Sequence, residues 1–321
     1  MSLVNSKEIA KVIKLDKFGW MGTFFGWMLL NTLRISKLNR IYKRHMHKED
    51  ITFLDGILKD FKIDFEIPEH DLARIPKDGA FITVSNHPLG GIDGILLLKL
   101  LVEKRPDYKI IANFLLHRIV PLKKYVMPVN PFEEHKDAKS SITGIKNALV
   151  HLSEGYPLGI FPAGEVSTFR DGKLVVDKPW EEGAIKIIKK ANVPVIPIYF
   201  HAKNSNLFYF LSSLNPTLRT AKLPSELLTQ KNIVIKVRIG KPISVKEQDG
   251  FTSLEDFHQY LRKKTYMLAN PFEKNNSFNN TGSFIFSKSI KKIIEPVSPE
   301  LMREELKVLD KNDSLIFTSK S

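Results

Sequence analysis

The hydrophobic pattern from residue 51 to about residue 270 alternates short apolar runs with longer segments of helical period. Short apolar runs bounded by turn residues are typical of buried strands, and strands that alternate with helices are typical of a parallel sheet covered by helices. We therefore expect an α/β fold with a mixed, mostly parallel sheet flanked by helices. The predicted strands are 61–67, 80–85, 108–114, 125–130, 157–161, 193–200 and 232–240.

The segments of helical period lie between these strands. One of them, 138–153, carries an apolar stripe (Ile142, Ile145, Leu149 and Leu152) that we expect to face the core. The last predicted strand alternates apolar with basic residues, which indicates an edge strand or a strand that buries one face. The predicted helices are 92–104, 138–153, 180–191 and 254–268.

The first fifty residues have a different pattern. An apolar stretch at 18–33 contains two tryptophans and lies between two clusters of lysine and arginine. It is shorter than the roughly 20 residues that span a membrane, whereas aromatic residues with basic flanks are typical of a helix in the membrane interface. A helix packed on the protein's own core is the alternative. A signal peptide is not favoured, because residues 32–36 offer no small-residue cleavage site.

The chain has 321 residues, a formal net charge of +14 and no cysteine. This length suits one domain with appendages, and the lack of cysteine excludes disulfides and thiolate metal sites. The positive charge favours an anionic partner, either nucleic acid or a phospholipid surface. Nucleic acid is the weaker choice, because the aromatic residues that would stack on bases cluster instead in the apolar N-terminal stretch.

These patterns divide the chain into four parts. Residues 1–50 form the amphipathic, interfacial helices, and residues 51–270 form the main domain. Residues 271–283 are rich in asparagine, which together with glycine and serine indicates a linker. The tail at 284–321 is too short for a core of its own. It either docks on the main domain or begins a second one.

The strongest chemical signal follows the predicted strand 80–85. The chain turns there through His87, Gly90, Gly91 and Asp93. A histidine accepts and returns a proton near neutral pH, and a carboxylate orients the ring. The glycine pair permits a reversal that brings the carboxylate to the ring, at the kind of strand end where α/β proteins place their chemistry. A purely structural histidine is the alternative.

The chain offers no obvious protein nucleophile for this base. It contains no cysteine and no G-x-S-x-G elbow. The base is therefore expected to act on a hydroxyl or amine of the substrate. The histidines also lack the spacing of a metal site, and we expect no metal and no cofactor.

A second turn follows the fifth predicted strand. In it Gly164 can present its backbone N–H to a phosphate or an oxyanion, and Glu165 can bind a cationic group or support the acceptor. A plain β-turn closed by Pro162 and Gly164 is the alternative. A basic cluster with Arg118 and Lys124 suits lipid headgroups or the acidic surface of an acyl carrier protein, unless it is only a solvated face.

Four blocks of sequence, taken together, resemble those of a known enzyme family. They occur in order at 87–93, 126–131, 161–165 and 193–198. With them, roughly residues 60–245 resemble the lysophospholipid acyltransferase family, the bacterial relatives of 1-acylglycerol-3-phosphate acyltransferase. The pair of motifs His-Pro-x-Gly-x-x-Asp-Gly and Phe-Pro-Ala-Gly-Glu is similar to a narrower, haemolysin-like branch, whose members make ornithine or glycine lipids.

The resemblance implies a glycerolipid acyltransferase-like fold in which His87 deprotonates an acceptor hydroxyl and Asp93 orients His87. The hydroxyl attacks the thioester of acyl carrier protein or coenzyme A without an acyl-enzyme. The expected location is peripheral, on the anionic cytoplasmic face of a bacterial inner membrane. Substrate binding is assigned to the second turn and the basic cluster, that is to Pro162, Gly164, Glu165, Arg118 and Lys124.

Three departures from the family pattern bear on the acceptor. Five residues separate His87 from Asp93, where the family has four. Ala163 and Glu165 stand where the family has glutamate and threonine. Pro131 occupies the place of an arginine thought to hold the acceptor's phosphate, and a proline cannot make that bidentate contact.

We therefore expect an O-acyltransferase that esterifies a lyso-lipid of the lyso-ornithine or lyso-glycine type. Lysophosphatidic acid is the alternative acceptor, and a non-catalytic basic protein that binds membrane or nucleic acid is a remote alternative. Residues 295–306 resemble the connector to the N-acyltransferase half of bifunctional enzymes. The chain is therefore expected to be the N-terminal portion of a longer protein or a truncated relative.

Overall fold

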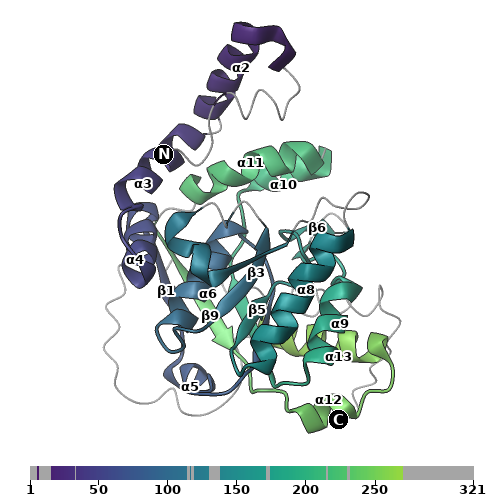
Figure 1. Cartoon of the computed structure of the whole chain (residues 1–321). Coiled ribbons are helices and arrows are strands. Elements are labelled where there is room, and N and C mark those ends of the chain that lie inside the picture. Colours follow the sequence, from purple (N-terminus) through teal and green to yellow (C-terminus); the bar gives the residue numbers. More distant parts are fainter. Residues whose placement is uncertain are drawn as a thin grey trace.

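The computed structural model describes residues 6, 16–32, 34–113, 116, 119–129, 138–170, 174–214, 216–229 and 232–269. Its centre is a seven-stranded sheet with the order β1-β9-β8-β2-β5-β3-β4 (Figure 1). Neighbouring strands are parallel except β8 and β9, which are antiparallel. Five strands therefore run one way and β1 and β9 the other, which confirms the predicted mixed, mostly parallel sheet.

Each of the seven predicted apolar runs coincides with one strand to within a few residues. The last of them is not at an edge, because β9 lies between β1 and β8. It does bury one face, since Ile235, Val237 and Ile239 are buried and Lys236 is exposed. The strands are β1 (Ile63–Glu66), β2 (Ile82–Ser85), β3 (Lys109–Asn113), β4 (Val126–Val129), β5 (Leu158–Ile160), β8 (Val195–His201) and β9 (Ile233–Ile239).

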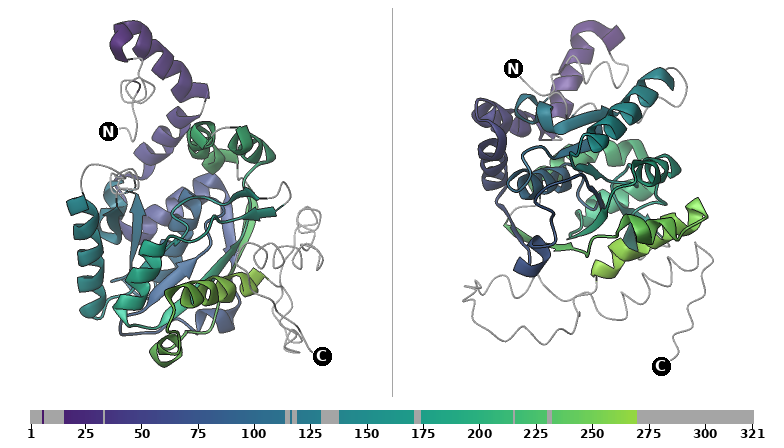
Figure 2. Two further views of the ribbon diagram at one scale, coloured as in Figure 1. Left: turned by 90° about the vertical axis from the view of Figure 1, so that its right-hand side faces the viewer. Right: turned by 60° about the horizontal axis from the view of Figure 1, so that its bottom comes forward.

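Two hydrophobic clusters hold helices on the two faces of the sheet (Figures 1 and 2). Helices α4 (Asp50–Phe61) and α6 (Gly91–Val102) pack on one face, together with Ile41 and Tyr42 of α3 (Ile35–His45). Helices α8 (Ala138–Ser153), α9 (Glu182–Ala191) and α13 (Leu254–Tyr266) pack on the other. The four predicted helices, α6, α8, α9 and α13, are therefore confirmed.

The apolar stripe of α8 is only partly in the core. Leu152 is buried and Leu149 packs against the cluster, but Ile145 is 37% exposed. The expectation for Ile145 was wrong because α8 packs against the edge strand β4, where the sheet ends and leaves part of the helix uncovered. The side chain of Ile142 lies outside the described residues.

Several elements were not predicted. Helix α11 continues through Pro224, although a proline inside a helix normally ends or kinks it. A two-stranded hairpin, β6 with β7, follows the second turn. The further elements are η1 (Asp16–Phe18), α5 (Glu69–Leu72), η2 (Val120–Tyr125), β6 (Thr168–Arg170), β7 (Leu174–Val176), α10 (Asn206–Leu214), α11 (Pro216–Thr229), α12 (Val245–Asp249) and η3 (Met267–Ala269).

Helix α2 (Gly19–Thr32) projects away from the sheet, on the side of the molecule where α10 and α11 lie (Figures 1 and 2). The large apolar side chains that the structure describes on this helix, from Trp20 to Met28, are not packed on the protein's own core. They are between 42% and 79% exposed, with the highest value at Trp20. Among the described residues, no helix combines the length and apolar character that crossing a bilayer requires. The predicted linker at 271–283 and the tail at 284–321 lie outside the described residues.

Candidate active site

The two turns predicted from the sequence meet at one edge of the sheet. His87 follows β2, and the segment 161–165 follows β5. Strands β2 and β5 are parallel neighbours, so both segments leave the sheet at its carboxyl edge. Strand β8, on the other side of β2, is parallel to it and ends at the same edge.

The structure brings His87 and Asp93 together. Nδ1 of His87 lies 3.2 Å from Oδ2 of Asp93, although the two groups are not aligned as a hydrogen bond. The same oxygen accepts the backbone N–H groups of Leu89, at 2.7 Å, and of Gly90, at 2.9 Å. The five intervening residues therefore form a closed turn that starts helix α6 around one carboxylate.

Gly90 makes this turn possible. Its φ is +78°, a conformation that side chains with a Cβ disfavour. A Cβ at this position would also lie 3.0 Å from Val166 and 3.3 Å from Leu223. The glycine is therefore needed both for the backbone conformation and for the close approach of the second turn and of α11.

Burial and local hydrogen-bond donors act in opposite directions on the Asp93 carboxyl. Burial raises the pKa of the Asp93 carboxyl above its ordinary value, against the opposing effects of the His87 ring and of the Leu89 and Gly90 N–H groups. The carboxyl is fully buried. It is therefore positioned to hold the ring and is shielded from solvent.

The ring of His87 is at the surface of this arrangement. Its side chain is 18% exposed, and the ring packs on Phe161 with centroids 4.3 Å apart. Phe161 comes from the second turn. The ring is therefore held between Asp93 and the second turn, and it is not enclosed in the interior.

Buried polar groups fix the backbone of His87 and of the following residue, Pro88. The His87 N–H donates to Oδ1 of Asp177, at 3.2 Å, and the His87 carbonyl accepts the Ser167 N–H, at 2.9 Å. The Ser167 hydroxyl donates to the same Asp177 oxygen, at 2.5 Å. The Asn204 side chain donates to the Pro88 carbonyl, at 2.9 Å. The sequence analysis identified neither Asp177 nor Asn204.

The second turn is a closed β-turn. The Gly164 N–H donates to the Phe161 carbonyl, at 3.0 Å, and the Pro162 carbonyl accepts the Glu181 N–H, at 2.8 Å. The N–H of Gly164 is thus already used, and it does not point at a ligand as one sequence interpretation expected. Gly164 itself is exposed, with φ at +66°.

Glu165 is engaged by two cations. Lys178 Nζ lies 2.8 Å from one carboxylate oxygen, and Nη2 of Arg219 lies 2.7 Å from the other. Burial acts to raise the pKa of Glu165, but the hydrogen bonds from Lys178 and Arg219 outweigh it and hold the pKa below its ordinary value. Glu165 is therefore ionised, and the positive charges of Lys178 and Arg219 already balance its negative charge. It has little capacity left to bind a cationic substrate group.

Helix α11 covers the turn between His87 and Asp93. Leu223 packs on Gly90 and Leu227 packs on Gly91. Glu226, which is 1% exposed, anchors the helix through the Ser205 N–H and hydroxyl, at 2.8 and 2.9 Å. Arg219 therefore lies on an element that is fixed over the site.

The structure does not bring Lys124 to His87. Lys124 precedes β4, which runs parallel to β2 through the sheet, so it lies towards the amino edge. Its ammonium is 2.6 Å from Asp50 of α4. Arg118 and Pro131 lie outside the described residues. In the part of the chain that the structure describes, no three histidine or carboxylate side chains gather as a metal site requires.

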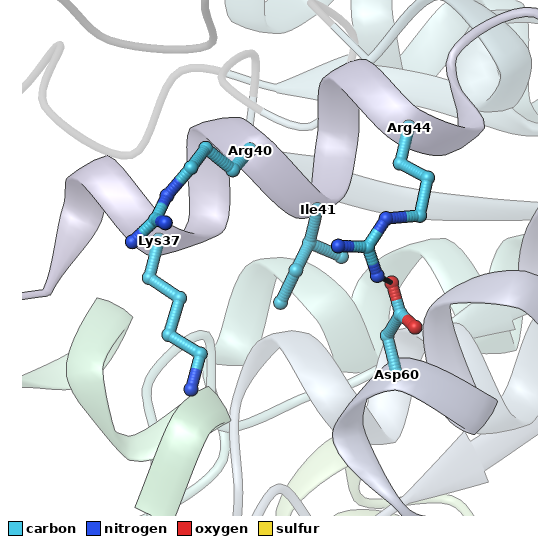
Figure 3. Close-up of a pocket in the computed structure, with 5 residues that line it drawn as sticks. All are labelled: Lys37, Arg40, Ile41, Arg44 and Asp60. Atoms are coloured by element: carbon cyan, nitrogen blue, oxygen red, sulfur yellow. Dashed lines mark hydrogen bonds and ion pairs between the residues drawn. The ribbon is translucent and has the colours of Figure 1, made fainter.

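A separate basic hollow lies on α3 and α4 (Figure 3). Lys37, Arg40 and Arg44 line it together with Ile41 and Asp60. Asp60 accepts from Arg44, at 2.7 Å, and contacts His45, at 2.9 Å. Three cations and one acidic residue form this hollow, immediately after the exposed helix α2.

A family model described as an acyltransferase matches residues 19–275, and so covers both turns and helix α11. The chain belongs to this acyltransferase family. A lyso-glycine lipid O-acyltransferase of Phocaeicola vulgatus is 24% identical to this acyltransferase over 273 residues, which are 83% of this chain and 95% of the relative. The protein of the same name from Bacteroides thetaiotaomicron is 24% identical over 274 residues, which cover 83% and 97% of the two chains.

Among solved structures, the acyltransferase is similar to the 1-acyl-sn-glycerophosphate acyltransferase PlsC of Thermotoga maritima. The similarity has a TM-score of 0.42 and 20% sequence identity, and it covers 76% of this chain and 87% of the other.

Proposed function

We propose that this acyltransferase moves a fatty acyl group from a thioester to the hydroxyl of a lyso-lipid, with His87 as the general base. The observation that carries the proposal is the His87–Asp93 pair, whose ring is accessible and whose carboxylate is buried. The names of the two relatives support a lyso-glycine lipid as the acceptor. The donor is acyl carrier protein or coenzyme A, each of which presents the acyl group as a thioester.

The reaction needs only one proton carrier from the protein. Nε2 of His87 accepts the proton of the acceptor hydroxyl as its oxygen attacks the thioester carbonyl, and the carbon–sulfur bond breaks as the tetrahedral intermediate collapses. The thiolate leaves with the proton from His87, and the product is an ester. Asp93 keeps Nδ1 protonated and stabilises the imidazolium. The chain has no cysteine, and this route needs no acyl-enzyme.

The site is proposed to work at an anionic membrane surface, with the protein bound peripherally. Exposed aromatic side chains on α2 and the basic hollow on α3 (Figure 3) suit insertion among acyl chains and contact with phosphate headgroups. Helix α10 adds an exposed apolar stripe, Leu207, Phe210 and Leu214, at helical spacing. Because α10 packs against α11, which covers the His87 turn, a membrane on this side would deliver the lyso-lipid to the site.

The test is an acyl-transfer assay with purified protein and anionic vesicles. Labelled acyl-acyl carrier protein and acyl-coenzyme A are each offered with a lyso-glycine lipid and, separately, with lysophosphatidic acid. We expect ester formation on the lyso-glycine lipid with at least one donor. Transfer to lysophosphatidic acid alone would contradict the proposed acceptor, and transfer to neither would contradict the proposed function.

A further inference from the structure

Arg219 is the cationic side chain of α11 that lies over the proposed active site. It precedes Leu223 by one helical turn, and Leu223 packs on Gly90 in the turn between His87 and Asp93. Residues four apart share one face of a helix. Arg219 therefore points to the same side of α11 as Leu223, where its Nη2 reaches Glu165 of the second turn.

The two cations around Glu165 differ in how many carboxylates they contact. Lys178 lies between two carboxylates, 2.8 Å from Glu165 and 2.7 Å from Glu181, which balance its charge. Arg219 contacts Glu165 through one nitrogen, Nη2, in the described part of the chain. A guanidinium carries five N–H donors in a fixed plane. Arg219 therefore has further donors to offer, and its side chain is 19% exposed.

This arrangement is suited to an anion and unsuited to a cation. A positively charged ligand would have to displace Lys178 or Arg219 from Glu165. A carboxylate can instead add to the open side of the Arg219 guanidinium, in the two-bond geometry that arginine favours. Glu165 would then act as the group that holds the guanidinium in place.

We infer that Arg219 binds a carboxylate of the acceptor lipid and so selects which lyso-lipid reaches His87. The inference rests on the proposed function. A glycine joined to its fatty chain through the nitrogen has lost its cationic amine and keeps a free carboxylate. The hydroxyl of such a lipid would lie at His87 while its carboxylate lies at Arg219.

The test uses ligands that bind without reacting. N-hexadecanoylglycine and its methyl ester share one chain and differ in one negative charge, and neither has a hydroxyl to acylate. Binding of both is measured to the full chain in neutral detergent, for the wild type, Arg219→Gln and the matched control Lys178→Gln. Both variants remove one of the two cations on Glu165. Thermal unfolding of each variant checks that the fold is retained.

We expect the wild type to bind the acid about tenfold or more tightly than the ester, as is typical of a charge-assisted pair. Arg219→Gln should bind both with the affinity of the ester, Arg219→Lys should keep part of the preference, and Lys178→Gln should keep it within about threefold. An undiminished preference in Arg219→Gln would overturn the inference. Tighter, Arg219-dependent binding of hexadecyl phosphate than of the acid would also overturn it, in favour of a phosphate site.

Turnover separates this inference from the proposed function. The hydroxyl-bearing acid and its methyl ester are compared as acceptors by their kcat/KM. Loss of the acid preference in Arg219→Gln, through a fall in kcat/KM for the acid, supports both. Equal use of acid and ester by the wild type leaves the function standing and defeats the inference. Arg219-dependent binding of N-hexadecanoylglycine without any transfer supports the inference and defeats the function.

Discussion

The turn that carries His87 and the helix α2 differ in how many internal contacts they make. Buried groups from three other segments fix the turn, through Ser167, Asp177 and Asn204. The large apolar side chains of α2 from Trp20 to Met28 are instead exposed, up to 79% at Trp20. A change in the turn therefore disturbs internal contacts and chemistry together. A change on the exposed face of α2 has few internal contacts to disturb and acts mainly on whatever binds from outside.

The largest effect is expected at the centre of the buried arrangement. Asp93→Asn keeps an oxygen that can accept from Leu89 and Gly90 but removes the charge that stabilises the protonated ring. We expect acyl transfer to fall by about 10²–10⁴-fold, measured by initial rates at saturating acceptor. A rate within a few-fold of the wild type would show that the turn only shapes the backbone.

The next effect sharpens the contrast with α2. In Trp20→Ser with Trp27→Ser, we expect affinity for anionic vesicles to fall by about tenfold or more, because each indole loses apolar burial in the interface. The midpoint of thermal unfolding should stay the same, since both rings are exposed. Flotation measures the affinity for vesicles, and calorimetry measures the unfolding midpoint. A clear drop in the unfolding midpoint would contradict the comparison, as would undiminished flotation.

A smaller effect is expected at Asp177, which binds the His87 turn directly but comes from a segment distant in the sequence. Asp177→Ala removes the acceptor for the His87 N–H and the Ser167 hydroxyl. We expect a loss of about 1–3 kcal/mol in the free energy of unfolding, because two buried donors lose their partner. We also expect kcat to fall about tenfold with little change in KM, since the ring shifts from the acceptor hydroxyl. An unchanged kcat would remove Asp177 from any part in positioning His87.

The smallest effect on activity is expected at His201, away from the site, where the change concerns the pH dependence of stability. Burial lowers the pKa of His201 to about 4, helped by Arg238 and Lys236 and opposed by a hydrogen bond with the backbone of Leu268. Between pH 6.5 and 4 the unfolded chain binds a proton on His201 that the folded chain does not, so stability falls as the pH falls. His201→Gln should remove up to about 3 kcal/mol of that loss. His70→Gln is the exposed control. Parallel stability curves for His201→Gln and the wild type would contradict this.

The sequence predicted those parts of the fold that depend on local patterns. The seven strands follow from short apolar runs, and the His87–Asp93 pair follows from a glycine turn after one of them. Contacts between distant segments have no such signal. Asp177 lies 90 residues from His87 and Arg219 lies 54 residues from Glu165. The basic cluster with Lys124 likewise carries no information about which edge of the sheet it occupies, and the structure places Lys124 beside Asp50 and away from His87.

The most direct test of the account is the rate of acyl transfer by His87→Ala. The exposed His47→Ala serves as the control, and unfolding midpoints are measured beside both rates. We predict that His87→Ala loses about 10²–10⁴-fold in rate or more while its unfolding midpoint stays close to that of the wild type. Transfer by a folded His87→Ala at nearly the wild-type rate would contradict the central claim that this ring removes the proton from the acceptor.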